Sequence, residues 1–217
     1  MRTAYFFSGF DPVAGFPSEV SDNLHKDIVN RDMLLFISSS PFGHEKSDKH
    51  MAGTIRWFEQ AGICFAVHRL LDDRADAAQA LDWVHRASCI FLMGGDTLAQ
   101  ITYIKDNGFL SAIRNSRAVV MGISAGAINM AKTSLCTKDK YTPKTVMYEG
   151  IGVADVTIEP HFTLDNWELI AELDLISQQH PIYAMCDGSA IIVRGESIVY
   201  IGDIHRIDKS QMKRIGA

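Results

Sequence analysis

Short runs of apolar residues alternate along the chain with longer segments whose apolar residues recur every three or four positions. The short runs predict buried strands at residues 3–8, 33–38, 63–67, 88–93, 118–123, 153–160, 182–185, 190–193 and 198–201. The longer segments predict helices at residues 45–60, 75–85, 98–106, 125–132 and 167–178. Such alternation is typical of the α/β class. It predicts a three-layer sandwich in which helices cover both faces of a mostly parallel central sheet.

Composition is consistent with a single α/β domain covering residues 1–217. The chain has 217 residues, of which 47% are hydrophobic, and it shows no repeat or linker rich in proline, glycine or serine. The net charge of −5, without a basic stripe, argues against nucleic acid as a partner. No apolar run approaches the ~20 residues that cross a bilayer, so we expect no membrane segment.

Cysteine usage bears on the compartment. Cys64, Cys89, Cys136 and Cys186 show no Cys-x-x-Cys spacing, and most lie in apolar stretches. We expect them to be free thiols rather than a disulfide framework, which favours the reducing cytoplasm.

The most informative motif lies where the apolar run at 118–123 ends. Gly122-Ile123-Ser124-Ala125-Gly126 places Gly-x-Ser-x-Gly between a predicted strand and a predicted helix. A nucleophilic serine on a tight strand-to-helix turn needs small neighbours, and Gly122, Ala125 and Gly126 provide them. Alternatively, the glycines only allow the helix to pack closely on the strand. The context of strand before and helix after favours Ser124 as a nucleophile.

A second glycine-rich turn, Gly94-Gly95-Asp96-Thr97, follows the predicted strand at 88–93. Acyl transfer needs N–H donors aimed at the developing oxyanion. We expect the amides of Ala125 and Gly95 to provide them. A phosphate-binding loop is the alternative, but neither Gly-x-x-x-x-Gly-Lys-Ser/Thr nor Gly-x-Gly-x-x-Gly is present, and Asp96 would repel a phosphate.

Among eight histidines, His161 stands out because it follows the predicted strand at 153–160. Ligands of open α/β sheets bind at the carboxyl ends of strands, so His161 is the best candidate for a general base. Three carboxylates compete to orient it. Glu159 is too close in sequence, Asp165 is placed to cap a helix, and Asp187 also follows a strand. We expect Asp187.

Four motifs, taken in order, resemble a known family. Gly94-Gly95-Asp96-Thr97, Gly122-Ile123-Ser124-Ala125-Gly126-Ala127, Pro160-His161-Phe162 and Asp187-Gly188-Ser189-Ala190 are similar to those of the serine peptidase family that contains peptidase E and cyanophycinase. The resemblance extends from the first strand to about residue 201. It implies a fold like that of the class I glutamine amidotransferases, with a serine in the place of their cysteine.

The resemblance also implies a mechanism. Ser124 would be the nucleophile, His161 the base and Asp187 the third member of a triad, with the Gly95 and Ala125 amides as the oxyanion hole. Two residues depart from the family pattern: Asp96 stands where asparagine is frequent, and Asp187 where peptidase E often has glutamate. The arginine-containing stretch that peptidase E usually has after the histidine is missing here.

We therefore expect a cytoplasmic serine peptidase acting on short peptides, dipeptides with N-terminal aspartate in particular. Asp96 is a candidate to receive the substrate ammonium group. We expect no cofactor, no metal ligands, and a monomer or small homo-oligomer. The rivals are a non-catalytic small-molecule-binding module on the same fold and an esterase or amidase; α/β-hydrolase esterases have the chain order Ser, acid, His. A metal hydrolase is disfavoured because His44 and His50 are not spaced as in His-Glu-x-x-His.

Overall fold

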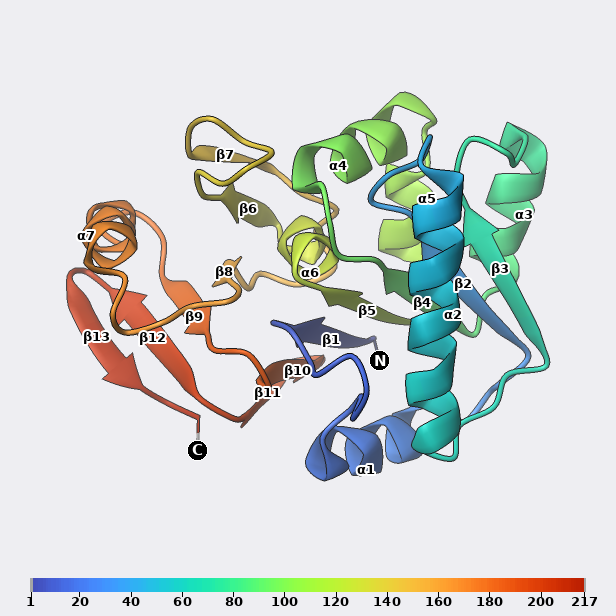
Figure 1. Ribbon diagram of the computed structural model, residues 1–217, viewed down its shortest axis with the longest axis horizontal. Coiled ribbons are helices and arrows are strands. Elements are labelled where there is room, and N and C mark those ends of the chain that lie inside the picture. Colours follow the sequence, from blue (N-terminus) through green and yellow to red (C-terminus); the bar gives the residue numbers. More distant parts are fainter. Residues whose placement is uncertain (1, 217) are drawn as a thin grey trace.

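A seven-stranded sheet forms the centre of the structure, a computed structural model that describes residues 2–216 (Figure 1). The strand order is β11-β10-β1-β5-β4-β2-β3. The strands are β1 (Thr3–Phe7), β2 (Met33–Ile37), β3 (Val67–Leu71), β4 (Cys89–Leu92), β5 (Val119–Ile123), β10 (Ala190–Arg194) and β11 (Ser197–Ile201). The pairs from β1 through β5, β4 and β2 to β3 are parallel, while β10 runs antiparallel to both β1 and β11.

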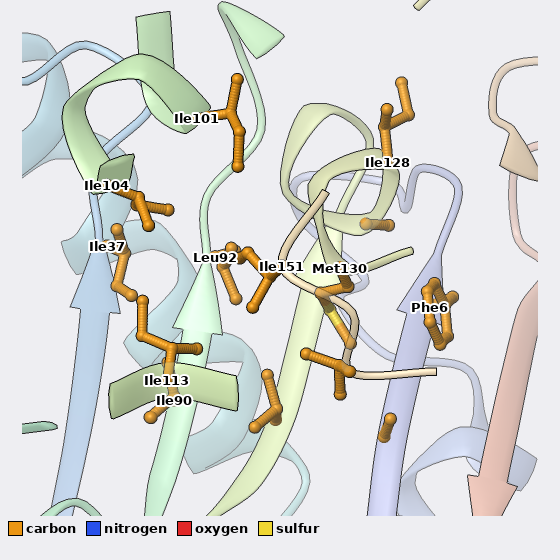
Figure 2. Packing of buried hydrophobic residues seen from close by; sticks show 14 of the residues in the cluster. Phe6, Ile37, Ile90, Leu92, Ile101, Ile104, Ile113, Ile128, Met130 and Ile151 are labelled. Carbon is orange, nitrogen blue, oxygen red and sulfur yellow. The ribbon is translucent and has the colours of Figure 1, made fainter. Parts of the chain in front are cut away.

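Helices cover both faces of this sheet because its central strands are apolar on both sides. In β1, Ala4 and Phe6 join one core cluster while Tyr5 and Phe7 join the other. The first cluster packs under α3 (Ala77–Arg86), α4 (Thr97–Asp106), α5 (Leu110–Asn115) and α6 (Ala125–Met130) (Figure 2). The second packs under α1 (Ser18–Asp27) and α2 (His44–Gln60). The predicted three-layer α/β architecture is confirmed.

A smaller sheet lies beside the antiparallel edge of the large one (Figure 1). Its order is β13-β12-β9-β8, from β8 (Ile158–Glu159), β9 (Ile182–Met185), β12 (Ile204–Asp208) and β13 (Gln211–Arg214). It packs with α7 (Trp167–Ile176) around a third core cluster that contains Phe162, Leu173 and Ile207. A two-stranded sheet, β6 (Thr133–Cys136) and β7 (Val146–Glu149), follows α6.

Several sequence predictions were wrong in their bounds. Residues 63–67 are not a strand: Ile63 and Phe65 are buried in a connection, where the Ile63 amide donates to Phe58 O after α2, and β3 begins only at Val67. The strand predicted at 153–160 is reduced to the two residues of β8, and the helix predicted at 125–132 ends at Met130. The elements α1, α5, β6, β7, β12 and β13 were not predicted.

All four cysteines are free thiols, as predicted. Across residues 2–216, none of the helices combines the length and the apolar character needed to span a membrane.

Candidate active site

Ser124 occupies a strained turn between β5 and α6. Its backbone has φ 52° and ψ −115°, which side-chain-bearing residues rarely adopt. Gly122 and Gly126, on either side of the serine, are required because a side chain at either position would clash with the backbone. A Cβ on Gly122 would lie 2.5 Å from the backbone carbon of Gly126, and one on Gly126 would lie 2.1 Å from Leu92 O. The turn is also tied to the neighbouring strand, because the Ser124 amide donates to Phe7 O at 2.9 Å.

His161 and Asp187 come together at this serine. His161 Nε2 lies 2.8 Å from Ser124 Oγ, and His161 Nδ1 lies 2.7 Å from Asp187 Oδ1. His161 follows β8 and has a positive φ of 56°, so it too is held in an unfavourable backbone conformation. Asp187 follows β9. The carboxyl ends of β5, β8 and β9 therefore bring together three residues that are far apart in sequence.

The other two candidate carboxylates lie elsewhere. Glu159 is 5% exposed; its Oε1 accepts from Thr137 Oγ1 at 2.9 Å, and its Oε2 has no hydrogen-bond partner within residues 2–216. Burial raises the pKa of Glu159 to about 8, with smaller contributions in the same direction from Glu172 and Asp139. Asp165 is exposed, and the neighbouring Asn166 caps α7. The structure therefore brings Asp187, of the three, to the imidazole.

The Gly94–Gly95 turn lies directly beside the serine. A Cβ on Gly94 would be 3.5 Å from Ser124 Cβ, and Gly95 has φ +138°, a conformation open to glycine. Ser39 Oγ donates to Gly94 O at 2.5 Å, and this bond holds the turn in place. Within the described residues the amides of Gly95 and Ala125 have no hydrogen-bond acceptor, which leaves both available to a ligand.

Asp96 has a structural contact of its own. It is the N-cap of α4, where its Oδ1 accepts from the Ala99 amide at 2.9 Å. Two cavities open on Ser124, and Asp96 lines neither of them.

Sequence reasoning missed the segment that holds these parts together, the end of β1. The buried Ser8 Oγ accepts from the His161 amide at 2.7 Å; it lies 2.9 Å from Met185 O and 3.1 Å from Asp187 Oδ1, to either of which it can donate. Gly9 O accepts from the Gly188 amide at 2.7 Å. The signal in the sequence was only a serine and a glycine at the end of the first strand.

Two cavities open on Ser124. One, of about 350 Å³, is lined by acidic residues: Asp139, Glu159, Glu168 and Glu172, with Lys138 as its cation. The other, of about 590 Å³, is lined by aromatic and basic side chains, Phe10, Trp57 and Tyr141 with Lys46, His50 and Lys140, and also by Asp139, which the two cavities share. Ser124, His161 and Gly95 belong to the walls of both.

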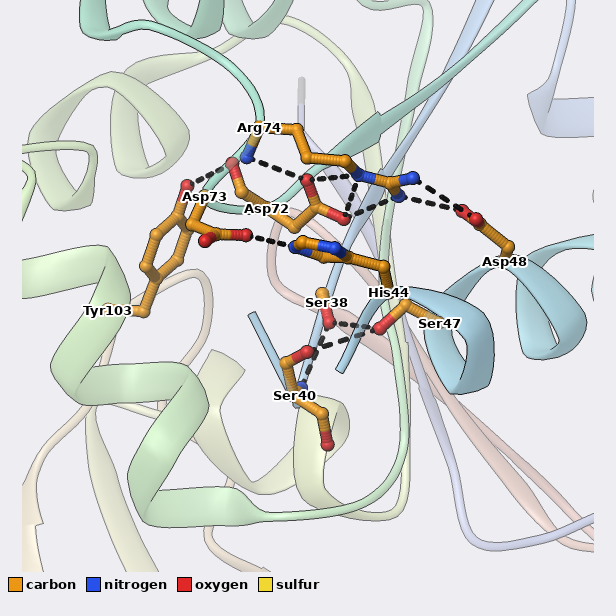
Figure 3. A network of polar contacts seen from close by, with 9 residues as sticks. All are labelled: Ser38, Ser40, His44, Ser47, Asp48, Asp72, Asp73, Arg74 and Tyr103. Atoms are coloured by element: carbon orange, nitrogen blue, oxygen red, sulfur yellow. Dashed lines mark hydrogen bonds and ion pairs between the residues drawn. The ribbon is translucent and has the colours of Figure 1, made fainter. Parts of the chain in front are cut away.

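Two sets of polar contacts lie near the site (Figure 3). Ser47 of α2 holds the loop that carries Ser39, because its Oγ lies 2.7 Å from Ser38 Oγ and donates to Ser40 O at 3.2 Å. The fully buried Asp72 carboxylate receives two Arg74 nitrogens, and Arg74 also bonds Asp48 of α2. These contacts with two carboxylates raise the pKa of Arg74. His44 Nε2 lies 2.5 Å from Asp73 Oδ1, so this histidine pairs with a carboxylate next to Asp72.

A serine on a strand-to-helix turn, bonded to a histidine that a carboxylate orients, is the arrangement of the serine hydrolases. The fold and the site therefore resemble those of the serine hydrolases that are built on an α/β sandwich. Residues 19–201 match peptidase family S51. Because this match covers most of the chain, the chain belongs to peptidase family S51, in agreement with the resemblance seen in its motifs.

Individual relatives agree with this assignment. The chain is 26% identical over 136 residues to a peptidase E of Actinobacillus pleuropneumoniae and 23% identical over 137 residues to a peptidase E of Haemophilus influenzae. These matches span only 58% of the length of the curated relatives. A solved peptidase from an acI-B1 Actinobacterium superposes with a TM-score of 0.74 at 15% identity, over 100% of this chain and 95% of that one. This likeness confirms the fold class.

Proposed function

We propose that the protein is a serine peptidase that hydrolyses short peptides through an acyl-enzyme. The observation that carries the proposal is the pair of short contacts at His161, 2.8 Å from Nε2 to Ser124 Oγ and 2.7 Å from Nδ1 to Asp187 Oδ1. A histidine so bonded can take a proton from the serine while the carboxylate fixes its tautomer.

The reaction follows from these positions. Ser124 Oγ attacks the peptide carbonyl as its proton moves to His161 Nε2, and the Gly95 and Ala125 amides receive the oxyanion. The imidazolium then gives that proton to the leaving amine as the C–N bond breaks, which leaves an acyl ester on Ser124. A water molecule, deprotonated by His161, hydrolyses the ester and restores the hydroxyl. Asp187 orients the imidazole and stabilises the imidazolium.

The charges of the two cavities favour a substrate with free termini. The acidic cavity, with Glu168 and Glu172, suits the α-ammonium group of an N-terminal residue. The other cavity presents Lys46 and Lys140 and suits the carboxylate of a short leaving group. A dipeptide whose scissile bond lies over Ser124 would place one terminus in each cavity.

An N-terminal aspartate is the proposed substrate side chain, with Lys138 as its partner in the acidic cavity. The test compares kcat/KM for Asp-X and Asn-X dipeptides. Lys138→Gln should lower the ratio of Asp-X to Asn-X hydrolysis by about tenfold, the effect of an interaction worth 1.4 kcal/mol. Lys144→Gln, at an exposed lysine outside both cavities, is the matched control. An unchanged ratio in Lys138→Gln would remove the aspartate preference from the proposal.

The rival function is a binding module without catalysis, and covalent chemistry separates the two. A fluorophosphonate should label Ser124 of the wild-type protein and fail to label Ser124→Ala. The same variant should lose on the order of 10³-fold or more in kcat while keeping its fold. An unlabelled wild-type protein that binds dipeptides without cleaving them would establish the binding module instead.

A further inference from the structure

A second cluster of chemically active side chains lies on the small sheet, outside the proposed triad. Cys186, Asp203 and His205 place one thiol, one carboxylate and one imidazole within 4.8 Å of one another. Sheet geometry explains why. The Cys186 amide donates to Asp203 O, which continues the β9–β12 ladder and sets these two residues opposite each other. His205 is two positions further along β12, so it shares their face.

The imidazole of this cluster lacks the partner that a buried nitrogen normally has. The His205 side chain is 9% exposed, and its Nε2 makes no hydrogen bond within the described residues. Asp203 Oδ1 is 3.2 Å away, in ion-pair range, but the angles do not form a bond. Phe162 packs against the ring at 5.6 Å between centroids and limits its rotation. A buried, unpartnered nitrogen calls for an explanation, and a bound cation is one.

We propose that Cys186, Asp203 and His205 form a binding site for a divalent transition metal, with Zn²⁺ as the best fit. Thiolate, imidazole and carboxylate are the three ligand types that zinc takes in proteins, and three protein ligands leave a fourth position for water. Zinc holds such ligands about 2.0–2.3 Å away, so donor atoms already within 4.8 Å need only small side-chain movements to close around it.

The local charges favour a cation. Burial, followed by the charges of Asp203 and Asp187, raises the pKa of the Cys186 thiol. A metal ion reverses this situation, because it replaces the thiol proton and offsets the surrounding negative charge. Arg214 is the competing cation: its Nε donates to Asp203 Oδ1 at 2.7 Å from a side chain that is 59% exposed. For Zn²⁺ to bind, either Arg214 must release Asp203 Oδ1 or the metal must bind Asp203 Oδ2 instead.

This site is separate from the peptidase chemistry, although Cys186 directly precedes Asp187. It departs from the prediction that the chain has no metal ligands, and no step of the proposed reaction uses a metal. The inference also stands if the protein proves not to be a peptidase, because it rests on three side chains that the proposed reaction does not use.

The test is direct metal binding to the full chain, freed of metal with a chelator and kept reduced with a phosphine. Zn²⁺ titrated in competition with a chromophoric chelator should bind at one equivalent. Cys186→Ser and His205→Gln should each weaken binding at least tenfold, while Arg214→Gln should tighten it because the competing guanidinium is gone. Cys64→Ser, at an exposed thiol, and His85→Gln, at an exposed histidine of α3, are the matched controls; both lie outside the cluster and should bind as wild type.

Co²⁺ provides a readout that does not depend on variants being stable. The wild-type protein should show a thiolate-to-cobalt charge-transfer band that Zn²⁺ abolishes. His161→Gln should keep this band, since the imidazole of the triad is not a ligand. Absence of the band in the wild-type protein, equal Zn²⁺ affinity in the Cys186→Ser/His205→Gln double variant, or loss of binding in His161→Gln would each overturn the proposal.

Discussion

Replacing Gly9 by alanine tests whether the end of β1 sets the geometry of the proposed triad. The added Cβ would lie 2.5 Å from Asp187 Oδ1 and 2.9 Å from His161 Cε1, where ordinary contact begins at 3.4 Å. The carboxylate oxygen must therefore retreat by about 0.9 Å (3.4 − 2.5) and the ring by about 0.5 Å (3.4 − 2.9). Gly9 is not among the residues with positive φ, so the backbone itself accepts alanine.

The expected magnitude follows from what these shifts do to one hydrogen bond. The Asp187–His161 contact is 2.7 Å long, and a displacement of 0.9 Å is enough to take it past the limit of useful bonding at ~3.5 Å. Loss of the orienting carboxylate costs a serine peptidase about 10⁴ in kcat. Because Asp187 can re-form part of the contact, we expect Gly9→Ala to lower kcat by about 10²–10⁴.

The assay is steady-state hydrolysis of a dipeptide together with the rate of fluorophosphonate labelling, which reports on the reactivity of Ser124 alone. Circular dichroism and thermal unfolding establish that the variant is folded. Gly53→Ala is the matched control: nothing lies within 4 Å of its Cβ inside α2, so activity should be unchanged and stability should rise by about 1 kcal/mol. A folded Gly9→Ala protein with kcat within threefold of wild type would refute the reasoning.

Three further substitutions follow from the same structure. Ser8→Ala leaves the His161 amide without its acceptor, so kinetics should show a kcat loss of at least tenfold and thermal unfolding a loss of about 1–3 kcal/mol. In Gly95→Ala the Cβ would meet Ser39 Oγ at 2.4 Å on a φ of +138°, and displacement of the oxyanion donor should lower kcat by about 10²–10³ with little change in KM. The pKa of Glu159 is about 8 in the folded protein and about 4.5 in the unfolded chain. The free energy of unfolding should therefore fall by up to a few kcal/mol as the pH rises between these values, because only the unfolded chain loses the proton. Chemical denaturation of Glu159→Gln at several pH values should lack this part of the decline.

The sequence predicted the large sheet well because its central strands are buried on both faces. The runs at residues 33–37 and 89–93 are apolar throughout, and they provide the strands β2 and β4. The same pattern did not predict the edge strand β3. Its residues His68 and Arg69 are partly solvent-exposed, while the apolar Ile63 and Phe65 just before it fill space under α2 without pairing. An apolar run indicates that its residues are buried. Buried residues are also paired with a neighbouring strand only in the interior of the sheet.

The candidate site was predictable to the extent that its residues depend on local structure. The Ser124 turn needs glycines at positions 122 and 126, and both are visible as a motif. The choice of Asp187 over Glu159 is a matter of long-range contact. Both residues follow or end a strand, and only the pairing of β8 with β9 decides which side chain turns toward the imidazole. The contacts of Ser8 span more than 150 positions in the sequence, so no local pattern marks them.

The end of β1 explains how three separate loops keep a common geometry. Phe7 O binds the Ser124 amide, Ser8 Oγ binds the His161 amide, and Gly9 O binds the Gly188 amide next to Asp187. The last residue of one central strand and the two residues that follow it thus hold the backbone at or beside each member of the proposed triad. Ser124 and His161 both have strained backbones, and such conformations persist only where surrounding contacts over-determine them. Because the three bonds originate from one short segment, a shift of β1 would move all three side chains together and preserve their mutual distances, whereas a substitution within the segment would change those distances.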